Sequence, residues 1–336
     1  MTTAIAFFNN KGGVGKTTLA CNFASYLSTE LGRRVAVADC DPQANATQLL
    51  LTDSAWEGIY EERRSAEERT ILKALKKIRA GDSTIVGDLE VHQSERFEVG
   101  VIAGHPTLSV VEDQLSSSWG EFQAKLLGGA RRSLWVRQLV KMLGESQDVV
   151  IFDLGPSLGA LNRSVLMGCD FFVTPVAADL FSLYALENIG DWVGGWLDEY
   201  DDAYKRLAPG ADTAEYDIPE RLPIRAGWAG YSVQQYVAKS AGGKIRGVQS
   251  YERYRQQIPE KAELLRKIAA PGIESNLGIV PNMFSMVPLA QTAHSPIADL
   301  KPADGVRGAQ VSQRLRYIEQ LNQMFETLAG NLGLDK

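Results

Sequence analysis

The sequence predicts an α/β fold in which short parallel strands alternate with helices. Three continuous apolar stretches support this prediction, because such stretches are typical of strands covered on both faces. They are residues 4–8 (AIAFF), 35–38 (VAVA) and 149–152 (VVIF). Between the first two, apolar side chains recur at helical spacing at Leu19, Phe23, Tyr26 and Leu27. With 336 residues, the chain is long enough for one large or two smaller domains of this class.

A glycine-rich segment, residues 9–18 (NNKGGVGKTT), joins the first strand to the first helix. Strand, glycine-rich turn and helix together form the context of a phosphate-binding loop, or P-loop. The glycines let backbone N–H groups turn inward, and these amides and the helix N-terminus attract phosphate oxygens. Lys16 is expected to neutralise the β- and γ-phosphates, and the Thr17 hydroxyl is expected to ligate Mg²⁺. The candidate nucleotide-binding residues are Gly12, Gly13, Val14, Gly15, Lys16, Thr17 and Thr18.

Carboxylates follow two of the predicted strands. Asp39 and Asp41 come after strand 35–38, and Asp153 ends strand 149–152. Ligands bind at the carboxyl ends of parallel strands, so these side chains should lie beside the phosphates. An apolar strand ending in Asp is typical of the residue that holds a water of the Mg²⁺ shell, which predicts this role for Asp153. The simpler alternative is helix capping, by Asp41 ahead of Pro42 and by Asp153.

Composition narrows the function classes. The net charge is −6, so no global basicity indicates nucleic acid. Cys21, Cys40 and Cys169 are widely spaced, which fits a reducing cytosol better than a disulfide framework. The P-loop begins too early for a signal peptide to precede it, and no apolar stretch reaches the roughly 18 residues of a membrane span. We therefore expect a cytoplasmic chain with no membrane association, and the scattered histidines predict no metal site.

The remaining periodicities predict further elements and two elaborations, at 52–90 and 198–222. The first is charged, with a helix over 70–80, and the second is an acidic loop. The last helix should bury Leu315, Ile318, Leu321, Phe325 and Leu328 on one stripe. The other expected elements are strands 97–102, 171–176 and 224–233 and helices 131–143, 157–165, 179–197 and 311–328.

One segment, residues 239–267, differs in charge from the rest of the chain. It contains eight basic and three acidic residues, a local excess of +5, with Tyr251 and Tyr254 among the cations. This pattern is typical of a nucleic-acid surface, although composition alone fits a solvated helical face equally well. The candidate DNA-binding residues are Lys244, Arg246, Arg253 and Arg255.

Three blocks occur in the order found in the ParA/MinD family of ATPases, and the chain resembles that family. The general P-loop pattern has glycine at the position of residue 10, but this chain has Asn10 followed by Lys11. The segment 11–17 (KGGVGKT) is similar to the family's "deviant" P-loop. The segment 39–43 (DCDPQ) resembles its switch I, and 148–156 resembles its Walker B strand and switch II.

The resemblance implies one doubly wound, mostly parallel domain over residues 1–336, with helices on both faces. It implies that Lys11 reaches the ATP of a partner subunit, that Asp41 orients the attacking water and that Asp39 supports the Mg²⁺ shell. Pro281 and Asn282 match the loop that wraps the adenine, and residues 108–115 resemble a segment in which family members carry a short helix near the dimer face. The implied activity is slow hydrolysis of ATP. ATP binding would produce a homodimer that binds DNA non-specifically on the nucleoid, until a ParB-like or other protein partner stimulates hydrolysis.

Three alternatives share this fold. A MinD-like membrane-positioning ATPase would carry a basic amphipathic C-terminal helix, which residues 329–336 do not supply. An iron–sulfur carrier would need paired cysteines at the dimer axis. A P-loop metabolic enzyme stays open, because the sequence does not reveal a substrate pocket.

Overall fold

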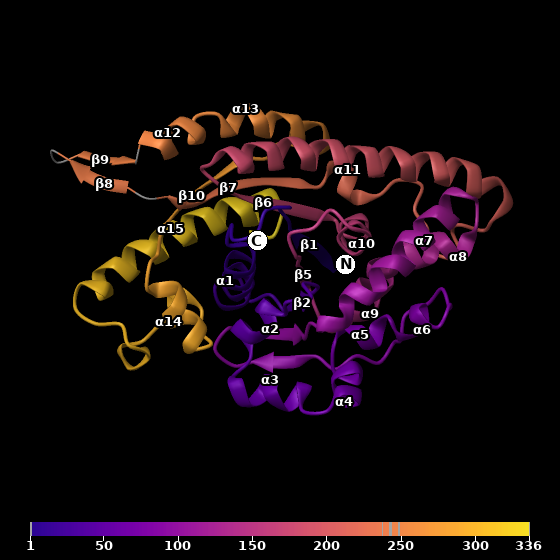
Figure 1. The fold of residues 1–336 in the computed structure, drawn as a ribbon, viewed down its shortest axis with the longest axis horizontal. Coiled ribbons are helices and arrows are strands. Elements are labelled where there is room, and N and C mark those ends of the chain that lie inside the picture. Colours follow the sequence, from indigo (N-terminus) through magenta and orange to yellow (C-terminus); the bar gives the residue numbers. More distant parts are fainter. Residues whose placement is uncertain (1, 237, 242–243, 248, 336) are drawn as a thin grey trace.

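The computed structural model describes residues 2–236, 238–241, 244–247 and 249–335. Its centre is an eight-stranded sheet in the order β10-β7-β6-β1-β5-β2-β4-β3 (Figure 1). Neighbouring strands are parallel except for β3 and β4, and β8 pairs with β9 in a separate antiparallel hairpin. The predicted α/β, mostly parallel class is therefore confirmed. The strands are β1 Thr3–Phe7, β2 Val35–Asp39, β3 His92–Ser94, β4 Val99–Ile102, β5 Val149–Asp153, β6 Phe171–Ala177, β7 Trp228–Tyr236, β8 Ala238–Ala241, β9 Lys244–Gly247 and β10 Asn276–Pro281.

Helices cover both faces of the sheet, and each face has its own apolar core. One core joins the sheet to α1, α2 and α15, and the other joins it to α7, α9, α10 and α11. The helices are α1 Lys16–Thr29, α2 Asn45–Leu50, α3 Asp53–Tyr60, α4 Arg63–Glu68, α5 Ile71–Ala74, α6 Lys76–Arg79, α7 Glu112–Gln123, α8 Leu127–Ser133, α9 Trp135–Leu143, α10 Ala160–Gly168, α11 Leu180–Leu207, α12 Gln249–Arg255, α13 Ile258–Ala262, α14 Met286–Thr292 and α15 Ala309–Asn331.

The register of the central strands builds the site. Asp153 at the end of β5 pairs with Phe7 of β1 on one side and with Asp39 of β2 on the other. All three strands are buried along nearly their whole length, as their apolar sequences predicted. Because the strands are parallel and end together, the P-loop and both carboxylates meet at one edge of the sheet.

Two predicted helices are broken in the structure. The helix expected over 70–80 is divided at Leu75 into α5 and α6, and the helix expected over 131–143 is divided at Leu134 into α8 and α9. Leu75 is fully buried and Leu134 is 3 % exposed. The apolar spacing is therefore satisfied by two short helices that change direction. The periodicity of apolar residues does not reveal a change in the direction of the helix axis.

The second elaboration was only partly predicted. The helix expected over 179–197 continues to Leu207, so the acidic insertion is a loop only over its second half. The strand expected over 224–233 is a 3₁₀ turn, Pro223–Ala226, followed by β7 from Trp228. Pro223 begins this turn, a position that suits its fixed φ.

Smaller differences occur at three other elements. The strand expected over 97–102 starts at Val99, and the short antiparallel β3 precedes it. The helices expected over 108–115 and 157–165 lie a few residues later, as α7 and α10. In α15, Leu321, Phe325 and Leu328 are buried as expected. Leu315, however, is 56 % exposed, so the prediction that it belongs to the buried stripe was wrong.

Candidate nucleotide-binding site

The P-loop has the backbone that its glycines predicted. Gly13 and Gly15 have φ values of 72° and 75°, a region that L side chains rarely adopt. Gly15 is the N-cap of α1 and provides no side-chain cap, so the first N–H groups of this helix face the loop. Free amides at a helix N-terminus form a site for an anion such as phosphate.

Lys16 lies inside this loop. Its side chain is 7 % exposed, and its Nζ donates a hydrogen bond to the carbonyl oxygen of Lys11 over 3.1 Å. Burial lowers the pKa of Lys16, while the charges of Asp153 and Asp41 act in the opposite direction. The ammonium is therefore held over the curve of the loop, in the position that a bound phosphate requires.

Thr17 and Asp153 contact each other at the base of the loop. The Thr17 Oγ1 donates to Asp153 Oδ2 over 2.7 Å. The second oxygen, Asp153 Oδ1, is buried and has no hydrogen-bond partner among the described residues. Burial, and then the charge of Asp39, raises the pKa of Asp153. A buried carboxylate oxygen without a partner beside a threonine hydroxyl fits a Mg²⁺ shell.

The described residues contain no group of three or more His, Cys, Asp or Glu side chains placed to hold a metal by themselves. Any Mg²⁺ at Thr17 and Asp153 would therefore take its other ligands from phosphate oxygens and water. Magnesium usually binds to nucleotide enzymes in this way.

The two aspartates of the switch I segment have different surroundings. The Oδ2 of Asp39 accepts hydrogen bonds from the backbone N–H and the hydroxyl of Thr47, at 2.8 and 2.7 Å, and its Oδ1 accepts from the N–H of Asp41. Burial raises the pKa of Asp39. Asp39 thus stabilises the loop that carries Asp41, and its part in the Mg²⁺ shell stays a prediction.

Asp41, in contrast, lines the cavity in front of the P-loop. Its Oδ1 accepts a hydrogen bond from the N–H of Gln43. A Cβ added at Gly155, in the segment after Asp153, would lie 3.1 Å from the same oxygen. The structure therefore brings the end of β5 and the switch I carboxylate into close contact, as expected of residues that respond to one phosphate.

Two adjoining cavities lie over the loop and share Gly15 and Thr18. The larger, about 780 Å³, is lined by residues 12–18 of the P-loop and by Asp41. The smaller, about 290 Å³, is lined by the predicted base contacts Pro281 and Asn282 and by an apolar set that the sequence did not indicate. That set is Val280, Met283, Phe284, Val287 and Pro288. A polar cavity continuous with a small apolar one fits a triphosphate joined to a flat base.

Gln234 is one of the polar residues that line the smaller cavity. It is buried, and its Nε2 donates to the Ser232 hydroxyl over 2.7 Å. Its Oε1 would lie 3.3 Å from a Cβ at Gly15, so it faces the P-loop.

Lys11 points to a carboxylate within its own chain. Its Nζ forms an ion pair with Asp179, whose other oxygen caps α11 by accepting from the N–H of Ser182. Both side chains are about one-third exposed. The structure thus places Lys11 at the surface next to the phosphate loop, and its contact with a partner's nucleotide stays a prediction.

The candidate DNA-binding residues lie apart from the cavities, on the β8–β9 hairpin and α12, which extend from one end of the sheet (Figure 1). Lys244 and Arg246 belong to β9, but their side chains lie outside the described part of the chain. Arg253 is exposed, whereas Arg255 forms an ion pair with Glu252. The structure therefore brings these residues together in one projecting region, and their contact with DNA stays a prediction.

Two observations concern the alternative functions. Cys21, Cys40 and Cys169 are fully buried, and burial raises the pKa of each thiol, which disfavours the thiolate that a cluster needs. Within the described residues, no helix has both the length and the apolar character needed to cross a bilayer.

Comparison with known proteins agrees with this geometry. A family model described as an AAA domain (AAA_31) matches residues 2–200. The chromosome-partitioning ATPase Soj of Thermus thermophilus is 33 % identical over 187 residues, which is 55 % of this chain and 57 % of Soj. The matches span only about half to two thirds of the length of the curated relatives.

Solved structures match over nearly the whole chain. The protein DIP2308 from Corynebacterium diphtheriae is 32 % identical, with a TM-score of 0.80 and full coverage of both chains. An ATP complex of a McdA variant from Cyanothece has a TM-score of 0.64 over 99 % of this chain and 96 % of its own, at 16 % identity, which shows the fold alone. The family match, together with the P-loop and its carboxylates, shows that the chain belongs to the ParA/MinD-type family of ATPases.

Proposed function

We propose that this chain is a Mg²⁺-dependent ATPase that works as a nucleotide-switched homodimer and binds DNA without sequence specificity when ATP is bound. The observation that carries the proposal is the Thr17–Asp153 pair, with its unpartnered carboxylate oxygen, at the base of a P-loop that Asp41 faces. The relatives support the nucleotide and the partition role: Soj of Thermus thermophilus is a chromosome-partitioning ATPase, and the McdA variant from Cyanothece forms a complex with ATP.

Each residue has a distinct part in the proposed reaction. The amides of the P-loop and the ammonium of Lys16 bind and orient the phosphates. Bound Mg²⁺ would neutralise charge on the β- and γ-phosphates, held through Thr17 and Asp153. Asp41 accepts a hydrogen bond from the attacking water and so aims it at the γ-phosphate.

The dimer is proposed to complete the site. Lys11 leaves Asp179 and contacts the nucleotide of the partner subunit, where its charge stabilises the transition state as an arginine finger does. Because this contact needs a γ-phosphate, the dimer persists only while ATP is bound. A ParB-like protein, or another partner that stimulates hydrolysis, then returns the chain to the monomer.

Turnover and nucleotide binding test the enzyme. Lys16→Ala should abolish binding of a fluorescent ATP analogue. Asp41→Ala should bind it normally and release no phosphate. Asp88→Ala is the matched control, because it removes a carboxylate that is 92 % exposed, and it should leave both measurements unchanged. Normal phosphate release by Asp41→Ala would refute the assigned water-orienting role.

DNA binding is tested separately, by fluorescence anisotropy with random-sequence duplex DNA and the Asp41→Ala protein. Binding should require ATP rather than ADP and should weaken steeply with salt, because phosphate contacts release counterions. Arg253→Ala should weaken binding and reduce the salt slope by about one. Lys205→Ala, which removes an exposed cation at the C-terminal end of α11, should not. If the protein forms ATP-dependent dimers that do not bind DNA, the ATPase proposal stands and the proposed DNA-binding surface is refuted.

A further inference from the structure

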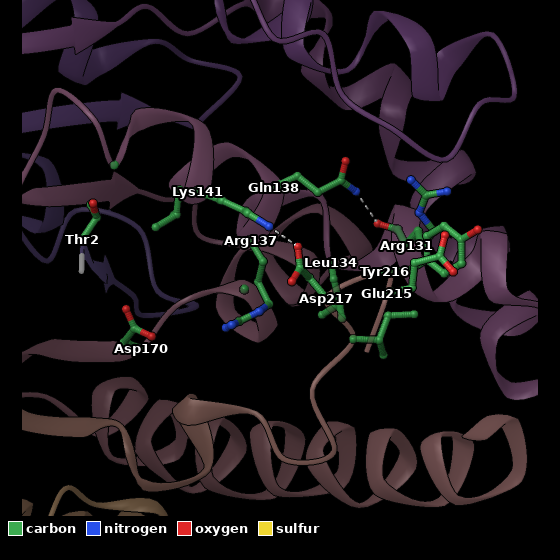
Figure 2. Close-up of a pocket in the computed structure, with 14 residues that line it drawn as sticks. Thr2, Arg131, Leu134, Arg137, Gln138, Lys141, Asp170, Glu215, Tyr216 and Asp217 are labelled. Atoms are coloured by element: carbon green, nitrogen blue, oxygen red, sulfur yellow. Dashed lines mark hydrogen bonds and ion pairs between the residues drawn. The ribbon is translucent and has the colours of Figure 1, made fainter. Parts of the chain in front are cut away.

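A second large cavity lies at the opposite edge of the sheet from the P-loop. Its volume is about 650 Å³, and it is lined by Thr2 just before β1 and by Asp170 just before β6 (Figure 2). These positions are at the amino ends of the strands, whereas the nucleotide cavities lie at the carboxyl ends. The size is within the range of small-molecule sites.

The acidic insertion forms one wall of this cavity, and its conformation is held by several contacts. The Arg131 guanidinium lies 4.7 Å from the centre of the Tyr216 ring, and Lys141 forms an ion pair with Asp217. Ile218 is 4 % exposed, and the Tyr200 hydroxyl donates to the carbonyl oxygen of Pro219 over 2.5 Å. The wall is therefore a built part of the fold that the sequence had described only as a loop.

Arg137 projects from α9 into this cavity and has no partner there. Within the described chain its guanidinium makes no hydrogen bond and no ion pair, and its Nε is buried. A buried N–H group without an acceptor costs roughly 1–3 kcal/mol, so proteins rarely leave one without a ligand or water. The Nε and one Nη of arginine form the fork that binds a carboxylate in a bidentate manner.

Asp170 gives the cavity a matching acceptor. Its Oδ2 accepts from the backbone N–H of Ala4 over 2.9 Å. Burial raises the pKa of Asp170, and the positive charge of Arg137 acts against this shift, yet the two head groups form no ion pair (Figure 2). The space between them can thus hold a group that accepts from Arg137 and donates to Asp170.

Part of the remaining lining is apolar and would cover a hydrocarbon body. Leu134, Val140 and Ile218 contribute to it, together with the ring of Tyr216. We propose that this cavity binds a small amphipathic carboxylate with a hydrogen-bond donor beside the acid group, that is, an amino or hydroxy acid with an apolar side chain. Its carboxylate pairs with Arg137, its ammonium or hydroxyl group donates to Asp170, and its side chain packs between α9 and the 215–218 segment.

Three probes with the same ring and different head groups test the proposal: L-phenylalanine, 3-phenylpropionate and phenethylamine. Binding to the full chain is measured by calorimetry and saturation-transfer NMR. L-phenylalanine should bind best, 3-phenylpropionate more weakly, and phenethylamine not saturably. In Arg137→Gln the affinity for L-phenylalanine should fall at least about tenfold, since a charged hydrogen-bonded pair is worth roughly 1.5–3 kcal/mol.

Matched controls separate this site from folding and from the nucleotide site. Lys205→Gln removes an exposed cation that does not line the cavity, so the affinity should change less than about twofold. Arg137→Gln should melt no lower than the unaltered chain and should bind ATP as the unaltered chain does. The proposal is overturned if no carboxylate probe binds saturably at millimolar concentration, if Arg137→Gln binds as tightly as the unaltered chain, or if ATP displaces the probe.

Discussion

The Lys11–Asp179 ion pair offers a direct test of the proposed ATP-dependent dimer. If Lys11 contacts the nucleotide of a partner, it must first leave Asp179, so the ion pair competes with dimerisation. Asp179→Asn removes the negative charge but keeps an oxygen that can accept from the N–H of Ser182, so α11 should remain capped. The substitution therefore releases Lys11 without unfolding the helix start.

The expected gain follows from the exposure of the pair. The Lys11 and Asp179 side chains are 28 % and 35 % exposed, and such partly exposed pairs contribute roughly 0.2–1 kcal/mol each. Two pairs must break for each dimer, so releasing both gives about 0.4–2 kcal/mol. That corresponds to an ATP-dependent dimer about 2- to 30-fold tighter.

Sedimentation equilibrium with ATP, in an Asp41→Ala background that does not turn over, measures the dimer constant. ADP should give monomers for both proteins. Asp179→Ala serves as the comparison, because it also removes the cap and should cost about 1 kcal/mol of stability. A dimer of Asp179→Asn that is no tighter than the parent, at an unchanged melting temperature, would refute the competition between the two contacts.

Three further substitutions test contacts that stabilise the fold around the nucleotide site. Gly104→Ala would place a Cβ 2.9 Å from the Asp39 Cγ, and urea unfolding should show a loss of about 1–3 kcal/mol. Burial lowers the pKa of His105 below its ordinary 6.5, so the unfolded chain takes up the proton first and stability falls as the pH drops below about 6.5. The His105 Nδ1 accepts from the N–H of Thr107, and His105→Asn, whose side-chain oxygen can take over this contact, should flatten that slope in melts from pH 5 to 8. Glu112 accepts from the N–H of Leu161 at the start of α10, and Glu112→Ala should cost about 0.5–2 kcal/mol in urea unfolding, whereas an unchanged midpoint would exclude this cap.

The sequence predicted those parts of the fold whose determining residues are close together in the chain. The P-loop, residues 9–18, carries its glycines, its lysine and its threonine within a single turn, so its conformation follows from local chemistry. The strands that end at Asp39 and Asp153 are buried on both faces, and their apolar runs reported this directly. The position of the P-loop and the carboxylates at one edge of the sheet then followed, because the carboxyl ends of parallel strands meet at the same edge.

The parts that were missed depend on residues far apart in the chain. Lys11 and Asp179 are separated by 168 positions, and no local pattern links them. Thr47 donates to Asp39 from both its amide and its hydroxyl, yet no pattern in the sequence distinguishes this threonine. The cavity beside Arg137 likewise depends on an insertion whose composition indicated only a loop.

The balance of charge at the P-loop indicates which form of the nucleotide the site accepts. Three carboxylates, of Asp39, Asp41 and Asp153, gather there with the ammonium of Lys16. The charge of Asp39 adds to burial in raising the pKa of Asp153, and the charge of Asp41 acts on the pKa of Asp39 in the same direction. A free triphosphate would bring further negative charge into this cluster, whereas a triphosphate that arrives with a divalent cation offsets it. If the chain binds ATP as proposed, these carboxylates would therefore favour the metal–nucleotide complex over the nucleotide alone.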